Sequence, residues 1–94
     1  MNYNITSIND ADGWIFISGD NSFEEPDAFV ALVKEISTSV NGKIIPVGHT
    51  QYRISNIPYD LLFQWDDLFG IVVINGNVTE TEDVLRFLKL YGIS

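Results

Sequence analysis

The chain of 94 residues has no cysteine and a single histidine, His49. Without cysteine it can form no disulfide framework, no thiolate metal site and no thiol nucleophile. One histidine cannot supply a histidine pair for acid–base chemistry or a histidine-rich metal site. The glycines are scattered and match no phosphate-binding loop. We therefore expect a protein that is not an enzyme and that holds no cofactor or metal ion.

Basic residues are also scarce: 5 lysines and arginines stand against 13 aspartates and glutamates, for a formal net charge of −8. Such a surface opposes binding to nucleic acid, whose phosphates require lysine and arginine, and to anionic membrane leaflets. No apolar run in the sequence, that of residues 71–74 included, is long enough to span a bilayer. Residues 1–6 contain neither a basic region nor a continuous apolar stretch, so we expect a cytoplasmic protein.

What the chain does contain is enough apolar material for a core. Hydrophobic residues make up 46% and aromatic residues 13% of the sequence, which is typical of a folded chain rather than a disordered one. Half of this length could not bury a workable core, so we expect residues 1–94 to form a single domain.

Local patterns in the first half of the chain predict two strands and a helix. Residues 3–8 alternate loosely and residues 14–17 are β-branched and aromatic, which indicates a hairpin around the turn formers of residues 9–13. Residues 26–39 predict a helix with Pro26 in its first turn and a stop at Asn41 and Gly42. Its apolar face is formed by Phe29, Val33, Ile36 and Val40.

The next segment, residues 43–54, predicts a hairpin that turns on Gly48 and His49. Pro46 has no N–H to donate to a ladder, so its strand should lie at an edge or a bulge. Pairing Val47 with Thr50 divides the side chains between two faces: Ile45, Val47, Tyr52 and Ile54 on one, and Ile44, Pro46, Gln51 and Arg53 on the other.

Residues 59–69 fit two patterns. Leu61, Phe63 and Trp65 alternate as in a strand, whereas a helical stripe also passes through this segment. We favour a strand that turns at Asp66 and Asp67, because residues 71–74 form a strong strand directly downstream. The residues that fit the helical alternative are Leu61, Leu62, Trp65, Leu68 and Phe69.

The last element is a helix. Residues 79–82 match a capping box with Thr79 at the N-cap, and the apolar face that follows consists of Val84, Phe87, Leu88 and Tyr91. The predicted element order is therefore ββαββββα. Hairpin-length connections indicate an α+β fold, with a largely antiparallel sheet of five to six strands and both helices packed on one face.

The segment of residues 10–13 superficially matches a calcium loop. The EF-hand pattern requires oxygen ligands at positions one, three and five, a glycine at six and a glutamate at twelve. Starting at Asp10 places Trp14 at position five, and setting Gly13 at position six places Gly19 at position twelve. Both registers fail, so we interpret the segment as a turn and expect no metal site.

The acidic residues are concentrated in two blocks, residues 10–27 and 60–83, that no lysine or arginine interrupts. A solvated surface with two charged helix starts would explain much of this charge. The alternative is an acidic face for a basic partner, which would relieve the repulsion and speed association. Helix starts account for residues 24–27 and 80–83 but not for Asp10, Asp12, Asp20, Asp60, Asp66 and Asp67.

Aromatic residues lie close to both acidic blocks. Trp14, Phe23 and Trp65 each neighbour acidic residues, and an aromatic anchor with an acidic rim is compatible with a binding hot spot. The plain alternative is that the tryptophans belong to the core. His49 is expected to be a surface residue of its turn.

In its size, acidity, lack of cysteine and α+β layout, the chain resembles the small immunity proteins that bacteria pair with nuclease toxins. It is similar in general character to barstar-type inhibitors and to the immunity proteins of contact-dependent growth inhibition systems. The resemblance implies an inhibitor, monomeric when free, that covers the active-site cleft of a basic toxin, with a ribonuclease as the expected class. The toxin-binding residues expected on this basis are Asp10, Asp12, Trp14, Asp20, Asp60, Trp65, Asp66 and Asp67.

Other functions remain open at this point. A regulatory or scaffold module would bind a peptide, or self-associate, through an exposed sheet edge. A DNA mimic would space its carboxylates like duplex phosphates along an elongated surface. A small enzyme would hold a carboxylate of raised pKa in an enclosed pocket.

Overall fold

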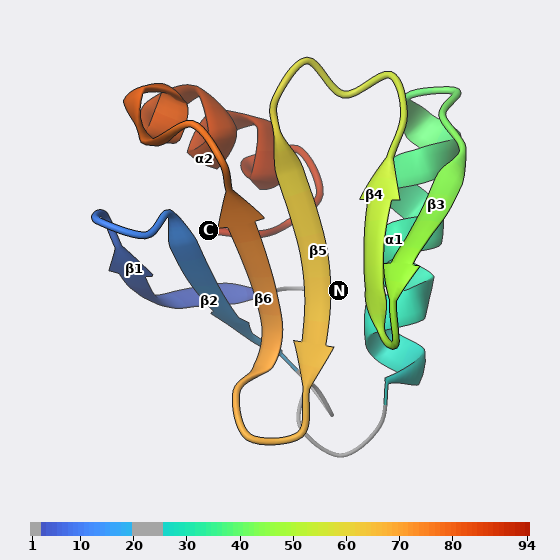
Figure 1. Ribbon diagram of the computed structural model, residues 1–94, viewed down its shortest axis with the longest axis horizontal. Helices are drawn as coiled ribbons and strands as arrows, with labels where there is room; N and C mark the ends of the chain where they lie inside the picture. Colours follow the sequence, from blue (N-terminus) through green and yellow to red (C-terminus); the bar gives the residue numbers. More distant parts are fainter. Residues whose placement is uncertain (1–2, 20–25) are drawn as a thin grey trace.

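The computed structural model describes residues 3–19 and 26–94, which form an antiparallel sheet with two helices (Figure 1). The order ββαββββα and the α+β class predicted from the sequence are confirmed. The elements are β1 (Asn4–Asn9), β2 (Trp14–Ser18), α1 (Asp27–Ser39), β3 (Ile44–Gly48), β4 (Gln51–Ile54), β5 (Leu61–Asp66), β6 (Gly70–Asn75), a 3₁₀ turn (Val78–Glu80) and α2 (Thr81–Lys89).

The strands lie in the order β1-β2-β6-β5-β4-β3, and every neighbouring pair is antiparallel. β6 is central, which explains its continuous apolar run: Ile71, Val72 and Val73 are all fully buried. The ambiguous segment before it is the strand β5, as favoured above. Pairing with β6 along its whole length, from Leu61 opposite Asn75 to Asp66 opposite Gly70, stabilises this segment as a strand.

Both helices pack on one face of the sheet, and the core lies between the two layers. Figure 1 shows α1 behind β3 and β4. Alternate residues of the strands point toward the helices, where they meet the apolar stripes of α1 and α2. The fully buried members of this core include Ile15, Ile17, Phe29, Leu32, Val33, Ile36, Phe63, Ile71, Val73, Val84 and Leu88.

One edge of the sheet is β3, where Pro46 lies as predicted. The carbonyl of Lys43 accepts the N–H of Ser55 at 3.0 Å, and hydrogen-bonded pairs alternate along an antiparallel ladder. The Pro46–Tyr52 pair is therefore not hydrogen-bonded, so the proline nitrogen faces the free edge. Proline thus removes a donor from the side where another strand would add.

The predicted register of the β3–β4 hairpin is wrong by one residue. The turn lies at His49 and Thr50 rather than at Gly48 and His49, and the register shifts between Pro46 and Gly48. Two local features cause this: an irregularity that adds Val47 to β3, and the left-handed backbone of Thr50, with φ of 57°. As a result, Ile44 and Pro46 share a face with Tyr52 and Ile54, whereas Ile45 lies opposite Arg53.

The predicted capping box at Thr79 is also wrong. A 3₁₀ turn precedes α2, and Asn77 caps that turn through its side chain. Asn77 Oδ1 accepts the N–H of Thr79 at 3.2 Å and the hydroxyl of Thr79 at 2.6 Å. The extra turn moves the start of α2 to Thr81, where Glu80 occupies the N-cap without a side-chain hydrogen bond. The helix α1 begins at Asp27, one residue after the predicted Pro26.

The other edge, β1, is partly covered by the end of the chain. Tyr3 and Ile93 form a parallel bridge beside β1. Three backbone hydrogen bonds hold it: Tyr3 N–H to the Gly92 carbonyl at 2.9 Å, Ser94 N–H to the Tyr3 carbonyl at 3.1 Å, and Ile5 N–H to the Ser94 carbonyl at 3.1 Å. Within residues 3–19 and 26–94, no helix has the length and apolar character needed to cross a membrane.

Candidate functional site

The sheet separates the residues singled out from the sequence into two groups, one at each end. Trp14 opens β2 and Asp60 precedes β5, while β6 ends between them at Asn75. Backbone bonds tie this end together: Asn75 N–H donates to the Gly13 carbonyl at 2.7 Å and Gly76 N–H to the Asp60 carbonyl at 2.8 Å. We call it the Asn75 end; its predicted residues are Asp10, Asp12, Trp14 and Asp60.

The opposite end of β5, called the Asp66 end, holds Trp65, Asp66 and Asp67. Because a strand rises about 3.3 Å per residue, Asp60 and Asp66 are about 20 Å apart along β5. Asp20 and Phe23, which the sequence analysis also singled out, lie outside the described residues. The structure therefore brings Asp10 and Asp12 of the first acidic block and Asp60 of the second together at one end of the sheet.

Further carboxylates join the Asn75 end from α2. The 3₁₀ turn and the first turn of α2 follow β6 directly and contribute Glu80, Glu82 and Asp83. The contacts Asn77 Nδ2 to Glu80 Oε1 at 2.8 Å and Asn75 Nδ2 to Thr81 Oγ1 at 3.5 Å fix this junction. Three separate segments of the chain thus place negative charge at one end.

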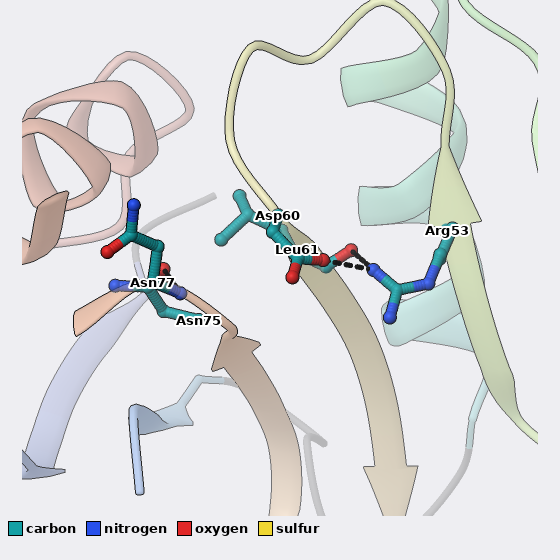
Figure 2. A network of polar contacts seen from close by, with 5 residues as sticks. All are labelled: Arg53, Asp60, Leu61, Asn75 and Asn77. Carbon is teal, nitrogen blue, oxygen red and sulfur yellow. Dashed lines mark hydrogen bonds and ion pairs between the residues drawn. The ribbon is translucent and has the colours of Figure 1, made fainter. Parts of the chain in front are cut away.

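Few of these carboxylates are compensated. Among the described residues, Arg53 pairs with Asp60 at 2.6 Å and Arg86 pairs with Asp83, and these are the ion pairs that form. Figure 2 shows the first of them: the Arg53 guanidinium also donates to the Leu61 carbonyl at 3.3 Å, so it spans β4 and β5. Repulsion among like charges without cations costs stability, which a basic partner would relieve.

The two aspartates of the Asp66 end differ in their roles. Asp66 Oδ1 accepts the N–H groups of Leu68 at 2.7 Å and Phe69 at 3.3 Å, so it shapes the β5–β6 turn. Asp67 is exposed and forms neither an ion pair nor a hydrogen bond with the described residues. The negative charge that is free for a partner at this end is therefore that of Asp67.

Two exposed apolar residues at the same turn were not predicted from the sequence as part of a binding surface. Leu68 is 77% exposed and Phe69 is 48% exposed. The Phe69 ring lies 5.7 Å from that of Phe16, and the two residues line a shallow pocket of about 350 Å³ with Thr6, Ser7 and Leu68. Two large apolar side chains within a turn were the available signal, since turns favour small and polar residues.

A second hollow opens beside Asp67, between the β3–β4 turn and the end of β5. Its volume is about 500 Å³. His49 is exposed at its border, as expected for a turn residue. The hollow is lined by His49, Thr50, Gln51, Gln64, Trp65, Asp66 and Asp67.

The two tryptophans lie on different faces of the sheet. Trp65 is half-buried and packs against the core on the helix side. This agrees with the alternative that the tryptophans belong to the core. Trp14 is half-buried on the opposite face, where its ring lies 5.9 Å from that of Phe16. We call this second face the outer face; the strand positions that alternate with the core residues place on it Trp14, Phe16, Leu62, Gln64, Val72 and Ile74.

The segment of residues 10–13 forms the β1–β2 turn, as interpreted from the sequence. Asn9 Oδ1 accepts the N–H groups of Ala11 at 3.1 Å and Asp12 at 3.3 Å, and Asn9 Nδ2 donates to Asp12 Oδ2 at 3.1 Å. In the part of the chain that the structure describes, no three acidic, histidine or cysteine side chains cluster in a way that could hold a metal ion.

Comparison of the chain with models of known protein families, with curated proteins and with solved structures gives no match.

Proposed function

We propose that this protein is an immunity protein that binds a basic toxin, with a ribonuclease as the expected class, and inhibits it by covering its active-site cleft. It acts by binding, as a monomer in the free state, and not by catalysis. The proposal places it in the cytoplasm, where the RNA substrate of such a toxin is found. Carboxylates of the Asn75 and Asp66 ends would occupy positions that the toxin uses for phosphates.

The observation that carries the proposal is the set of exposed carboxylates that lack an internal cation. Asp10, Asp12 and Asp67 are exposed, and within the described residues none of them has a basic partner. They lie in turns at the ends of the sheet, and none of them packs in the core or stands in the first turn of a helix. A surface of this kind raises the association rate with a cationic partner and makes binding sensitive to salt.

Two features disfavour the alternative function, a regulatory or scaffold module that binds a peptide or self-associates through a sheet edge. Pro46 withdraws a donor from the free side of β3, and the Tyr3–Ile93 bridge covers the start of β1. These are devices by which proteins keep sheet edges from pairing.

Co-purification followed by an activity assay tests the proposal. The tagged chain is expressed in its native cell, and a basic protein should be retained at low salt and released at high salt. The released protein should degrade RNA, and adding the purified chain back should abolish that activity. The proposal fails if no basic protein is retained at low salt, or if the retained protein is equally active with the chain bound.

A further inference from the structure

A row of apolar side chains crosses the outer face near the Asn75 end. Trp14 of β2 pairs with Ile74 of β6, and Ile74 pairs in turn with Leu62 of β5. Cross-strand partners project to the same side and lie in contact distance of one another. All three side chains are half-buried, although α1 and α2 pack on the other side of the sheet. The row therefore offers apolar surface that the helices do not cover.

A second row runs beside it and changes from apolar to polar. Phe16 pairs with Val72, Val72 pairs with Gln64, and Gln64 pairs with Gln51. Val72 is fully buried between its neighbours, and Gln51 Nε2 donates to Gln64 Oε1 at 2.8 Å. Phe69 extends the apolar part of this row through its contact with Phe16. The apolar surface is thus centred on β2 and β6.

Carboxylates border this surface at both ends of the strands. Alternation along β5 places Asp60 and Asp66 on the same face as Leu62, but Asp60 is paired with Arg53 and Asp66 accepts the N–H groups of the β5–β6 turn. Exposed Asp12 and Asp67 stand in the adjoining turns. An apolar centre with acidic borders is complementary to an apolar segment that has basic residues on both sides.

We propose that the outer face is the docking surface for the toxin, and that the toxin contacts it through a segment whose apolar side chains are flanked by lysine or arginine. This inference rests on the proposed function and specifies the surface and the chemistry of the partner. The apolar side chains of the partner would cover Trp14, Ile74 and Leu62. Its cations would lie against Asp12 at one border and Asp67 at the other.

A second copy of the chain does not fit this face. Each copy carries a formal net charge of −8, and face-to-face packing would bring the acidic borders of two copies together. Like charges brought together in an interface oppose association. The charge on the borders therefore selects a cationic occupant.

Peptide titration followed by NMR tests the inference on the full chain. The probe is a peptide with a Leu-Trp-Leu centre and two lysines on each side. The controls are the same centre flanked by glutamates, and a Gly-Ser-Gly centre flanked by lysines. We expect the first peptide to shift the amide signals of Phe16, Leu62 and Ile74 and the indole signal of Trp14, and to bind at least tenfold more tightly than either control.

Two matched variants separate this face from the rest of the surface. Leu62→Gln changes the outer face, whereas Leu90→Gln changes a side chain that is 77% exposed just after α2. The first should weaken the lysine-flanked peptide at least fivefold, and the second should leave its affinity unchanged. Equal binding of the Gly-Ser-Gly peptide, shifts confined to α1 and α2, or concentration-dependent dimers of the free chain would each overturn the inference.

The outcome can be distinguished from the fate of the proposed function. If the chain inhibits a co-purified basic ribonuclease and Leu62→Gln inhibits it equally well, the outer face is not the docking surface and the proposed function stands. If no basic protein is retained while the peptide still binds at Trp14 and Leu62, the face binds such segments but the protein is not an immunity protein of this kind.

Discussion

The carboxylate of Asp60 lies directly over Gly76, the residue that follows β6. A Cβ atom on residue 76 would overlap Asp60 Oδ2 and stand 2.7 Å from Asp60 Cγ. Glycine at this position therefore leaves room for Asp60 to reach Arg53 on β4, at 2.6 Å. The absence of a side chain just after β6 thus permits an ion pair between Asp60, at the start of β5, and Arg53 on β4.

This relationship predicts an energetic coupling between the two positions. Gly76→Ala should displace Asp60 and destabilise the protein, whereas in the Asp60→Ala background the same change should be neutral or stabilising. We expect a coupling energy of about 1 kcal/mol, since residues in contact commonly couple by 0.5–3 kcal/mol. Urea denaturation of the four proteins measures it. Identical effects of Gly76→Ala in both backgrounds would show that Asp60 does not require the space.

Gly13 should tolerate alanine far less well. Its φ is 75°, and a Cβ there would collide with the carbonyl oxygen of Asn75 and stand 3.1 Å from the carbonyl carbon. Left-handed backbone and a backbone collision together should cost about 2–3 kcal/mol. For a domain of this size that lowers Tm by roughly 10 °C or more. Gly48→Ala is the control, because its Cβ would meet only the flexible end of the Gln51 side chain, at 2.5 Å.

Because Asp66 accepts two backbone N–H groups of the β5–β6 turn, we expect its replacement to lower the stability of the protein. Asp66→Ala removes the acceptor of two backbone N–H groups and should destabilise the protein by about 1 kcal/mol, as loss of a helix cap does. Asp66→Asn keeps the acceptor and should recover most of this loss. Asp67→Ala should change the free energy of unfolding by less than about 0.5 kcal/mol. Thermal unfolding in which Asp67→Ala is the more damaging change would contradict this assignment.

Charge reversal at Asp67 tests electrostatic attraction to the basic partner. Asp67→Lys should lower the association rate several-fold at low ionic strength, and the difference should shrink above about 0.5 M salt, where the Debye length is only a few ångströms. Glu35→Lys, on the exposed side of α1, changes the net charge equally and is the control. Stopped-flow association rates measure both. The double reversal of Asp66 and Asp67 should slow association further, but it also disturbs the turn, so the single change is cleaner.

The fold was largely predictable because each element follows a local rule. The apolar spacing of α1, the alternation of β5 and the β-branched run of β6 each match one period of secondary structure. The position of Pro46 at an edge followed from its missing N–H. Registers and caps were less predictable. The β3–β4 register depends on Thr50, whose left-handed backbone is accompanied by a hydrogen bond of its hydroxyl to the Trp65 carbonyl at 3.0 Å.

The candidate surface was only partly predictable from the sequence. The charge pattern singled out Asp12 and Asp67, but sequence distance could not show that β5 places Asp60 and Asp66 at opposite ends of the sheet. Nor could composition separate Trp14 from Trp65. Their difference comes from which face each strand position occupies, and that is fixed by pairing with β6.

The bridge between Tyr3 and Ile93 also determines how the fold would respond to mechanical load. Because the two segments run parallel, tension applied through residues 3 and 94 pulls them along their lengths in opposite directions. The three hydrogen bonds that join Tyr3 and Ile5 to Gly92 and Ser94 are then loaded together rather than one after another. These hydrogen bonds would therefore resist stretching in shear. The force would act on the central strands only after the hydrogen bonds of the Tyr3–Ile93 bridge break.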